Sequence, residues 1–163
     1  MGAGKTTMGR QIAKRLHMDF ADSDHAIEAH TGADIPLIFE KEGEEGFRRR
    51  EIAVIDELTQ LNHLVLATGG GAILAEENRQ HLKNRGIVIY LHSDIKYLIE
   101  RTRHDKNRPL LQTPDPAAKL KELMKTREPL YRETADIIIN TGHQSIKTVI
   151  STMLDKIKKF QDY

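Results

Sequence analysis

The stretch GAGKTT, residues 2–7, has the composition of the loops that bind nucleotide phosphates in α/β proteins. In such a loop, consecutive backbone N–H groups surround the phosphates at the positive end of the helix that follows. Glycines let the backbone approach the ligand, Lys5 supplies a positive charge, and the Thr6 hydroxyl can bind Mg²⁺. The full motif needs a glycine two positions before Met1, so it is incomplete here. The residues expected to form the phosphate loop are Gly2, Ala3, Gly4, Lys5, Thr6 and Thr7.

Helix and strand patterns alternate along the rest of the chain. Met8, Ile12 and Leu16 recur at the spacing of one helix face, which predicts a helix directly after the loop. Short runs predicted to be strands occupy residues 18–24, 63–71, 86–93 and 135–140. Apolar strands that alternate with helices are typical of a parallel sheet covered on both sides. The predicted fold class is therefore α/β, a phosphate-loop fold whose parallel sheet is flanked by helices on both faces.

Capping residues and apolar stripes predict the remaining helices. Gly32 closes one short helix, and Asp34 with Pro36 marks the start of the next. A longer helix is expected over 44–61, with Ile52, Ile55, Leu58 and Leu61 on its buried face. A helix is expected over 94–103, another from the end of the following loop to about Tyr131, and a last one at the C-terminal end of the chain. The polar, proline-containing run 103–116 is expected to be a mobile loop.

Composition excludes several classes of protein. A chain of 163 residues predicts a single domain, here 1–163. The 25 basic and 24 acidic residues give a net charge of +1, so no bulk attraction to nucleic acid or to an anionic membrane is expected. There is no cysteine, and the apolar runs are far shorter than a membrane span, so a cytoplasmic protein is expected. The eight histidines show no metal-ligand spacing.

Two acids follow the first predicted strand in the sequence DSD. Asp22 and Asp24 lie two positions apart, so both carboxylates can point the same way from an extended strand. The carboxyl ends of strands are where open α/β sheets bind ligands. One acid could hold hydrated Mg²⁺ while the other accepts a proton from a substrate hydroxyl. The alternative is that Asp24 merely caps the next helix.

The second predicted strand runs into the glycines of TGGG, residues 68–71. Glycines at this position let a ligand lie against the backbone and use its N–H groups. Most phosphate-loop nucleoside triphosphatases carry an Asp or Glu at this strand end, and this chain has none there. The pattern favours a small-molecule kinase over a motor protein or a GTPase.

Taken in order, the motifs GAGKTT, DSDHAIE, GEEGFRRRE, TGGGAIL, RPLL and REPLY resemble those of shikimate kinases. The resemblance extends over nearly the whole chain. It implies transfer of a phosphoryl group from ATP to the 3-hydroxyl of shikimate, in the biosynthesis of aromatic amino acids. It also implies Mg²⁺ as cofactor and a monomer that binds neither nucleic acid nor membrane.

The resemblance assigns roles on the nucleotide side. The phosphate loop would bind ATP, with Thr6 as a Mg²⁺ ligand and Asp22 reaching the ion through water. Lys5 would act on the phosphates, and Arg108 in RPLL would close over them from a lid at 103–116. The residues implied at the far end of the nucleotide are Arg101, along the adenine, and Gln144, in the loop before the last helix.

The resemblance also assigns the substrate side, with the substrate-binding helices at 23–61. Asp24 would contact a shikimate hydroxyl and act as the base. Arg48 and Arg127 would bind the shikimate carboxylate, for which planar guanidinium groups are well suited. Arg132 is a nearby alternative to Arg127. The glycines expected to contact shikimate are Gly69, Gly70 and Gly71.

Two other functions stay open at this point. A related small-metabolite kinase, for example one for gluconate, would share the phosphate loop but not the DSD, GFR, GGG and RPLL motifs together. A regulatory or inactive nucleotide-binding module is the second alternative, although such a module need not keep Asp24 and Arg48.

The resemblance further predicts a strand that the sequence does not contain. In the family, the strand before the phosphate loop lies at the centre of a five-stranded sheet of order 2-3-1-4-5. The four strands predicted here are the flanking ones. A sheet without its centre would leave two rows of backbone groups unpaired, at about 1–3 kcal/mol for each buried group. We expect that residues upstream of Met1, or another segment, occupy that place.

Overall fold

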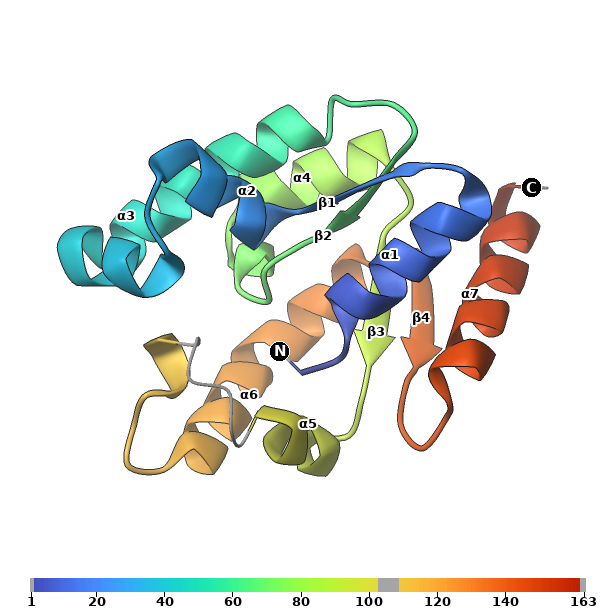
Figure 1. Cartoon of the computed structure of the whole chain (residues 1–163). Coiled ribbons are helices and arrows are strands. Elements are labelled where there is room, and N and C mark those ends of the chain that lie inside the picture. The colour runs from blue at the N-terminus through green and yellow to red at the C-terminus, as the bar shows by residue number, and fades with distance from the viewer. Residues whose placement is uncertain (1, 103–108, 162–163) are drawn as a thin grey trace.

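The computed structural model describes residues 2–102 and 109–161 of the chain (Figure 1). Its α-helices are α1 (Lys5–Leu16), α2 (Ser23–Thr31), α3 (Ile35–Leu58), α4 (Glu76–Arg85), α5 (Ile95–Thr102), α6 (Pro116–Thr134) and α7 (Ile146–Gln161). Its strands are β1 (Asp19–Asp22), β2 (Leu64–Ala67), β3 (Ile89–His92) and β4 (Ile137–Asn140). Two short 3₁₀ helices are η1 (Ala72–Leu74) and η2 (Pro109–Leu111). The predicted alternation of strands and helices is confirmed.

The strands form two parallel pairs. β1 pairs with β2 from Asp19 opposite Leu64 to Asp22 opposite Ala67. β3 pairs with β4 over four residues in the same way, from Ile89 opposite Ile137. Among the described residues these are two separate two-stranded sheets rather than one continuous sheet. In Figure 1, α1 passes between the two pairs, and it contacts β1, β2 and α7.

A cavity of about 420 Å³ separates the two pairs of strands. β2 and β3 both line it, together with Ile12 of α1 and Met153 and Ile157 of α7. In the order 2-3-1-4-5, the expected central strand would lie between these two strands. The expectation of a central strand stays a prediction.

Two clusters of buried side chains support the fold. The larger joins α1 to α7 and to the β3–β4 pair, with Met8, Ile12 and Ile150 among its members. The smaller lies within α2 and α3 and contains Ile27 and Phe47. The helices expected to bind substrate therefore have an apolar cluster of their own. In the described part of the chain, no helix is both long and apolar enough to cross a bilayer.

The helix predicted to start at Asp34 and the one predicted over 44–61 are joined in the structure. α3 runs from Ile35 to Leu58, and Gly43 interrupts it with a φ of 69°, in the left-handed region that favours glycine. The predicted end at residue 61 is wrong, because Thr59 forms the C-cap and its hydroxyl donates to the Ile55 carbonyl. Leu61, expected on the buried face, is 57% exposed as a result.

Helix α4 has no counterpart among the predicted elements. Its sequence, EENRQHLKNR, has Leu82 as its one large apolar residue, so no apolar stripe marks it. Ala75 precedes it and gives no side-chain cap. The expected loop at 103–116 is described only in its second half, where η2 forms and α6 begins at Pro116. Arg108 lies outside the described residues.

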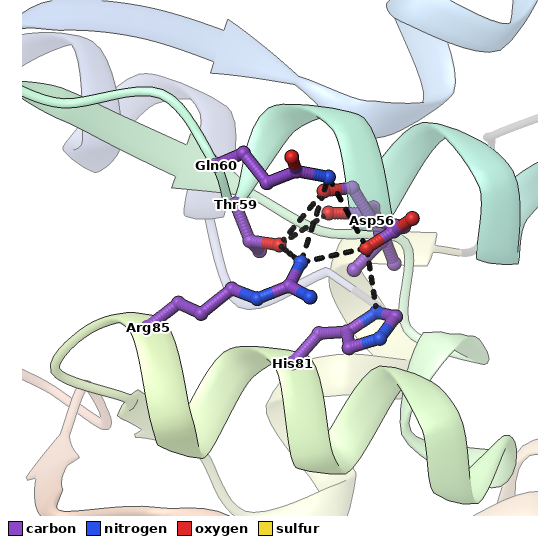
Figure 2. Close-up of polar contacts among 6 residues, drawn as sticks. Asp56, Thr59, Gln60, His81 and Arg85 are labelled. Atoms are coloured by element: carbon purple, nitrogen blue, oxygen red, sulfur yellow. Dashed lines mark hydrogen bonds and ion pairs between the residues drawn. The ribbon is translucent and has the colours of Figure 1, made fainter.

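A group of polar side chains fastens α4 to the end of α3 (Figure 2). Nη1 of Arg85 donates to Oδ1 of Asp56 at 2.7 Å, to the Asp56 carbonyl at 3.1 Å and to the Thr59 hydroxyl at 3.0 Å. Nδ1 of His81 lies 3.6 Å from Oδ1 of Asp56. The hydrogen bond from Arg85 lowers the pKa of Asp56. Arg85 thus satisfies carbonyl and side-chain acceptors at the C-terminal end of the helix that carries Arg48.

Asp56→Asn is expected to lower the melting temperature near neutral pH and to have little effect in strong acid. A carboxyl whose pKa is lowered by folding stabilises the protein above its ordinary value of 3.8, and this contribution disappears as the pH falls through the lowered pKa. Thermal melts of both proteins at about pH 7 and about pH 2 measure it. Glu57→Gln, at the neighbouring position, is the control. A difference that persists unchanged in acid would contradict the prediction.

Candidate active site

The phosphate loop forms the start of α1. Gly4 is the N-cap residue with a φ of 82°, and Gly2 has a φ of 68°, so both occupy the left-handed region that favours glycine. Within the described residues, no side chain caps this helix. Arg101, on α5, donates from Nη1 to the Gly2 carbonyl at 3.3 Å. A helix start with glycines and no side-chain cap suits an anionic ligand.

Asp22 connects this loop to α2. The Thr6 hydroxyl donates to Oδ2 of Asp22 at 2.7 Å. The other oxygen, Oδ1, accepts from the N–H groups of Asp24 at 3.0 Å and His25 at 3.4 Å. Asp22 is therefore the N-cap of α2, and the alternative reading of Asp24 as the cap is wrong. Asp24 lies in the first turn instead.

Thr6 and Asp22 bring a hydroxyl and a carboxylate oxygen together at the phosphate loop. The described residues contain no group of three or more His, Cys, Asp or Glu side chains able to hold a metal ion. Mg²⁺ does not need such a cage, since it keeps several waters and is bound by one or two protein oxygens together with substrate phosphates. The donor set of these two residues fits Mg²⁺ bound in that way.

The glycine segment after β2 packs against acids of α2 and α3. The Gly69 N–H donates to the hydroxyl of Ser23, which is fully buried, at 3.0 Å. A Cβ at position 69 would lie 2.7 Å from Oδ1 of Asp24 and 2.9 Å from Oε1 of Glu51. A side chain at this position would therefore have to displace these carboxylates. Ser23, the middle residue of DSD, was not expected to have this role.

Arg48 lies against the same segment. Its Nη1 donates to Oε2 of Glu51 at 2.6 Å and its Nη2 to Oε1 of Glu44 at 3.1 Å. A Cβ at Gly71 would overlap its guanidinium group. The arginine predicted to bind the substrate carboxylate is thus held over the glycines predicted to contact the substrate.

Glu51 is a site residue that sequence reasoning missed. Its side chain is 1% exposed, and Oε1 has no hydrogen-bond partner among the described residues. Burial raises its pKa, against the opposing effect of Arg48. The signal available was its position three residues after Arg48 on a helix, where the two side chains can meet. Glu51 fixes the direction of the Arg48 guanidinium group.

Arg127 is buried on α6 with part of its guanidinium group unpaired. It is 2% exposed, and Nε and Nη2 have no partner in the described part of the chain. Burial lowers its pKa, and the charge of Arg48 lowers it further. Nε and Nη2 form one edge of the guanidinium fork, the arrangement that binds a carboxylate with two parallel hydrogen bonds. Arg132 instead pairs with Glu128 at 2.8 Å on the surface.

A sequence model of the shikimate kinase family matches residues 1–158. The chain belongs to the shikimate kinase family. A shikimate kinase of Bordetella pertussis is 55% identical over 161 residues, which are 99% of this chain and 76% of that protein. One of Cupriavidus pinatubonensis is 58% identical over 158 residues, 97% of this chain and 82% of that one.

Solved structures agree with this family. A structure titled shikimate kinase from Acinetobacter baumannii in complex with shikimate has a TM-score of 0.95 and 53% identity, covering 98% of this chain and 89% of that one. A gluconokinase from Sinorhizobium meliloti has a TM-score of 0.66 at 19% identity, which shows a shared fold alone. The predicted phosphate-loop kinase fold is confirmed.

A small cavity of about 90 Å³ connects the parts of the site in this member of the shikimate kinase family. It is lined by Ala3 and Lys5 of the phosphate loop, and by Gly69 and Gly70. Tyr131 of α6 lines it as well. The structure therefore brings together the phosphate loop, the acids, the glycines and both predicted arginines. Gln144 is exposed in the loop before α7, next to His143, whose ring contacts Tyr97 of α5.

Proposed function

We propose that this protein transfers the γ-phosphoryl group of ATP to the 3-hydroxyl of shikimate, giving shikimate 3-phosphate and ADP. The observation that carries the proposal is the buried guanidinium edge of Arg127 near the charge of Arg48. An unpaired buried cation is costly, and a substrate carboxylate would compensate it. The fold shared with a gluconokinase does not by itself explain why Arg48 and Arg127 lie close together.

The proposed chemistry begins with the acceptor hydroxyl. Arg48 and Arg127 would bind the carboxylate of shikimate and so fix the direction of its ring. Asp24, beside Gly69, would accept the proton of the attacking hydroxyl. The N–H groups of Gly70 and Gly71 would hold remaining polar groups of the substrate, since that of Gly69 donates to Ser23.

The nucleotide side would neutralise charge. The phosphate loop and Lys5 would bind the phosphates, and Arg101 and Gln144 would contact the nucleotide beyond them. Thr6, and Asp22 through water, would hold Mg²⁺, which when bound neutralises charge on the phosphates. Arg108 would lie over the phosphates, a role that only the RPLL motif supports. We further propose a cytoplasmic monomer.

A coupled assay of ADP release tests the function. ADP release is expected to depend on shikimate, with the 3-phosphate as product. Activity with gluconate and none with shikimate would overturn the proposal in favour of another small-metabolite kinase. Tight ATP binding without ADP release in the presence of either compound would favour an inactive nucleotide-binding module.

Arg48→Lys is expected to weaken shikimate binding by about 2 kcal/mol, because lysine cannot replace the planar fork that holds a carboxylate. ATP affinity should hardly change. Titration of each ligand into the variant measures both values. Arg49→Lys, on the exposed side of α3 and paired with Glu45 at 2.9 Å, is the control. An equal loss of ATP affinity would mean that Arg48 is structural.

A further inference from the structure

Tyr131 makes contacts that none of the roles above explains. It lies on α6, one helical turn after Arg127, so the two side chains share a face of the helix. Its hydroxyl donates to the Gly70 carbonyl and also interacts with the Arg127 guanidinium group. Its ring stacks on that of Tyr90 in β3, with centroids 4.9 Å apart and an interplanar angle of 25°. The phenol therefore joins α6, β3 and the glycine segment.

The direction of these hydrogen bonds matters for Arg127. The Tyr131 hydroxyl has one proton, which the Gly70 carbonyl accepts. Its lone pairs are then available to an N–H group of Arg127, which has donors but no acceptor. The atoms of Arg127 left without a partner in the described residues, Nε and Nη2, form one edge of its fork. Because Tyr131 holds the rest of the guanidinium group, the edge formed by Nε and Nη2 is the one left to bind a ligand.

We propose that Tyr131 is a positioning residue, whose hydroxyl is anchored by its hydrogen bond to the Gly70 carbonyl and holds the Arg127 guanidinium group in place for the carboxylate of the substrate. The inference rests on the proposed function and deepens it. Tyr131 does not touch the reacting atoms. It acts through Arg127, and the stack on Tyr90 keeps its ring in register.

Tyr131→Phe separates the hydroxyl from the ring. Phenylalanine can keep the stack on Tyr90 while losing both hydrogen bonds, so the fold should persist. The variant is expected to raise the KM for shikimate about tenfold, the value of a net hydrogen bond or slightly more. The kcat and the KM for ATP should change by less than about twofold. Tyr90→Phe, which removes the hydroxyl of the stacking partner, is the matched control and should leave all three constants unchanged.

A double-mutant cycle tests whether Tyr131 acts through Arg127. In an Arg127→Gln background, Tyr131→Phe should raise the KM for shikimate by less than about twofold, because the group that it positions is gone. Equal effects in both backgrounds would overturn the proposal. So would a Tyr131→Phe variant that raises both KM values together and melts well below the native protein, the pattern of a purely structural residue.

The two proposals fail in different ways. If the native protein shows no ADP release with shikimate, the proposed function is wrong, and the role of Tyr131 falls with it. If the native protein phosphorylates shikimate and Tyr131→Phe has the same KM for it, the function stands and the role of Tyr131 is overturned.

Discussion

Asp24→Asn is expected to lower kcat by about 10²–10⁴-fold, the usual contribution of a positioned base. Asparagine has nearly the same size as aspartate and can keep the packing against Gly69, where a Cβ would lie 2.7 Å from Oδ1. It cannot accept the proton of the attacking hydroxyl. The KM for ATP should change little, because the phosphate loop lies at α1. Steady-state kinetics with each substrate varied in turn measure these values.

Asp19→Asn provides the control for this variant. Asp19 begins β1, the strand that leads into α2, and is exposed, so its replacement removes the same charge far from the glycine segment. Its kcat should equal that of the native protein. An Asp24→Asn variant that keeps more than about a tenth of the native kcat would exclude Asp24 as the base, since general-base catalysis contributes at least about 10²-fold.

The parts of the site that could be predicted from sequence are local ones. The phosphate loop is a continuous motif, and its glycines do have the left-handed φ values that such a loop requires. Asp22 could be placed at the end of its strand, whereas Asp24, predicted to point the same way from that strand, lies in the first turn of α2, because the strand ends at Asp22 and the Asp22 carboxylate caps the helix. The fold class followed from the alternation of apolar segments, which the two parallel strand pairs confirm.

The parts that could not be predicted depend on contacts between distant segments. The Ser23–Gly69 hydrogen bond spans 46 positions, and the Tyr131–Gly70 bond spans 61. Neither serine nor tyrosine carries a charge that would mark it as a partner. Glu51 directly follows the three arginines at 48–50, in a charged segment typical of a solvated helix face, and only packing against Gly69 shows that it is buried. Helix α4 was not predicted because it buries few apolar side chains, so its sequence shows no apolar stripe.

The cavity between β2 and β3 has the properties of a missing strand position. Each of these strands is hydrogen-bonded along one edge, to β1 and to β4, and the described residues offer no strand to the other edge. Ile12, Leu66 and Ile89 are among the apolar side chains that line the space. A strand placed there would pair with both edges and bury this lining.

A protein extended upstream of Met1 by about ten residues, enough for an apolar strand and the first turn of the loop, is therefore expected to be much more stable than the 163-residue chain. Several new backbone hydrogen bonds at about 1 kcal/mol each, with the apolar burial, should add at least about 4 kcal/mol. For a domain of this size, that raises the melting temperature by about 10 °C or more. ATP affinity should rise as well, because a strand would anchor the entry to Gly2.

The matched control is an extension of equal length rich in glycine and serine, which adds chain without the apolar, β-branched residues that a buried strand needs. Thermal melts and ATP titrations of the three proteins decide the matter. The apolar extension alone should give the higher melting temperature and the tighter nucleotide binding. If the 163-residue chain already melts sharply at the same temperature and binds ATP as tightly, the cavity does not need a strand, and the two halves of the fold are held together by α1 and α7 instead.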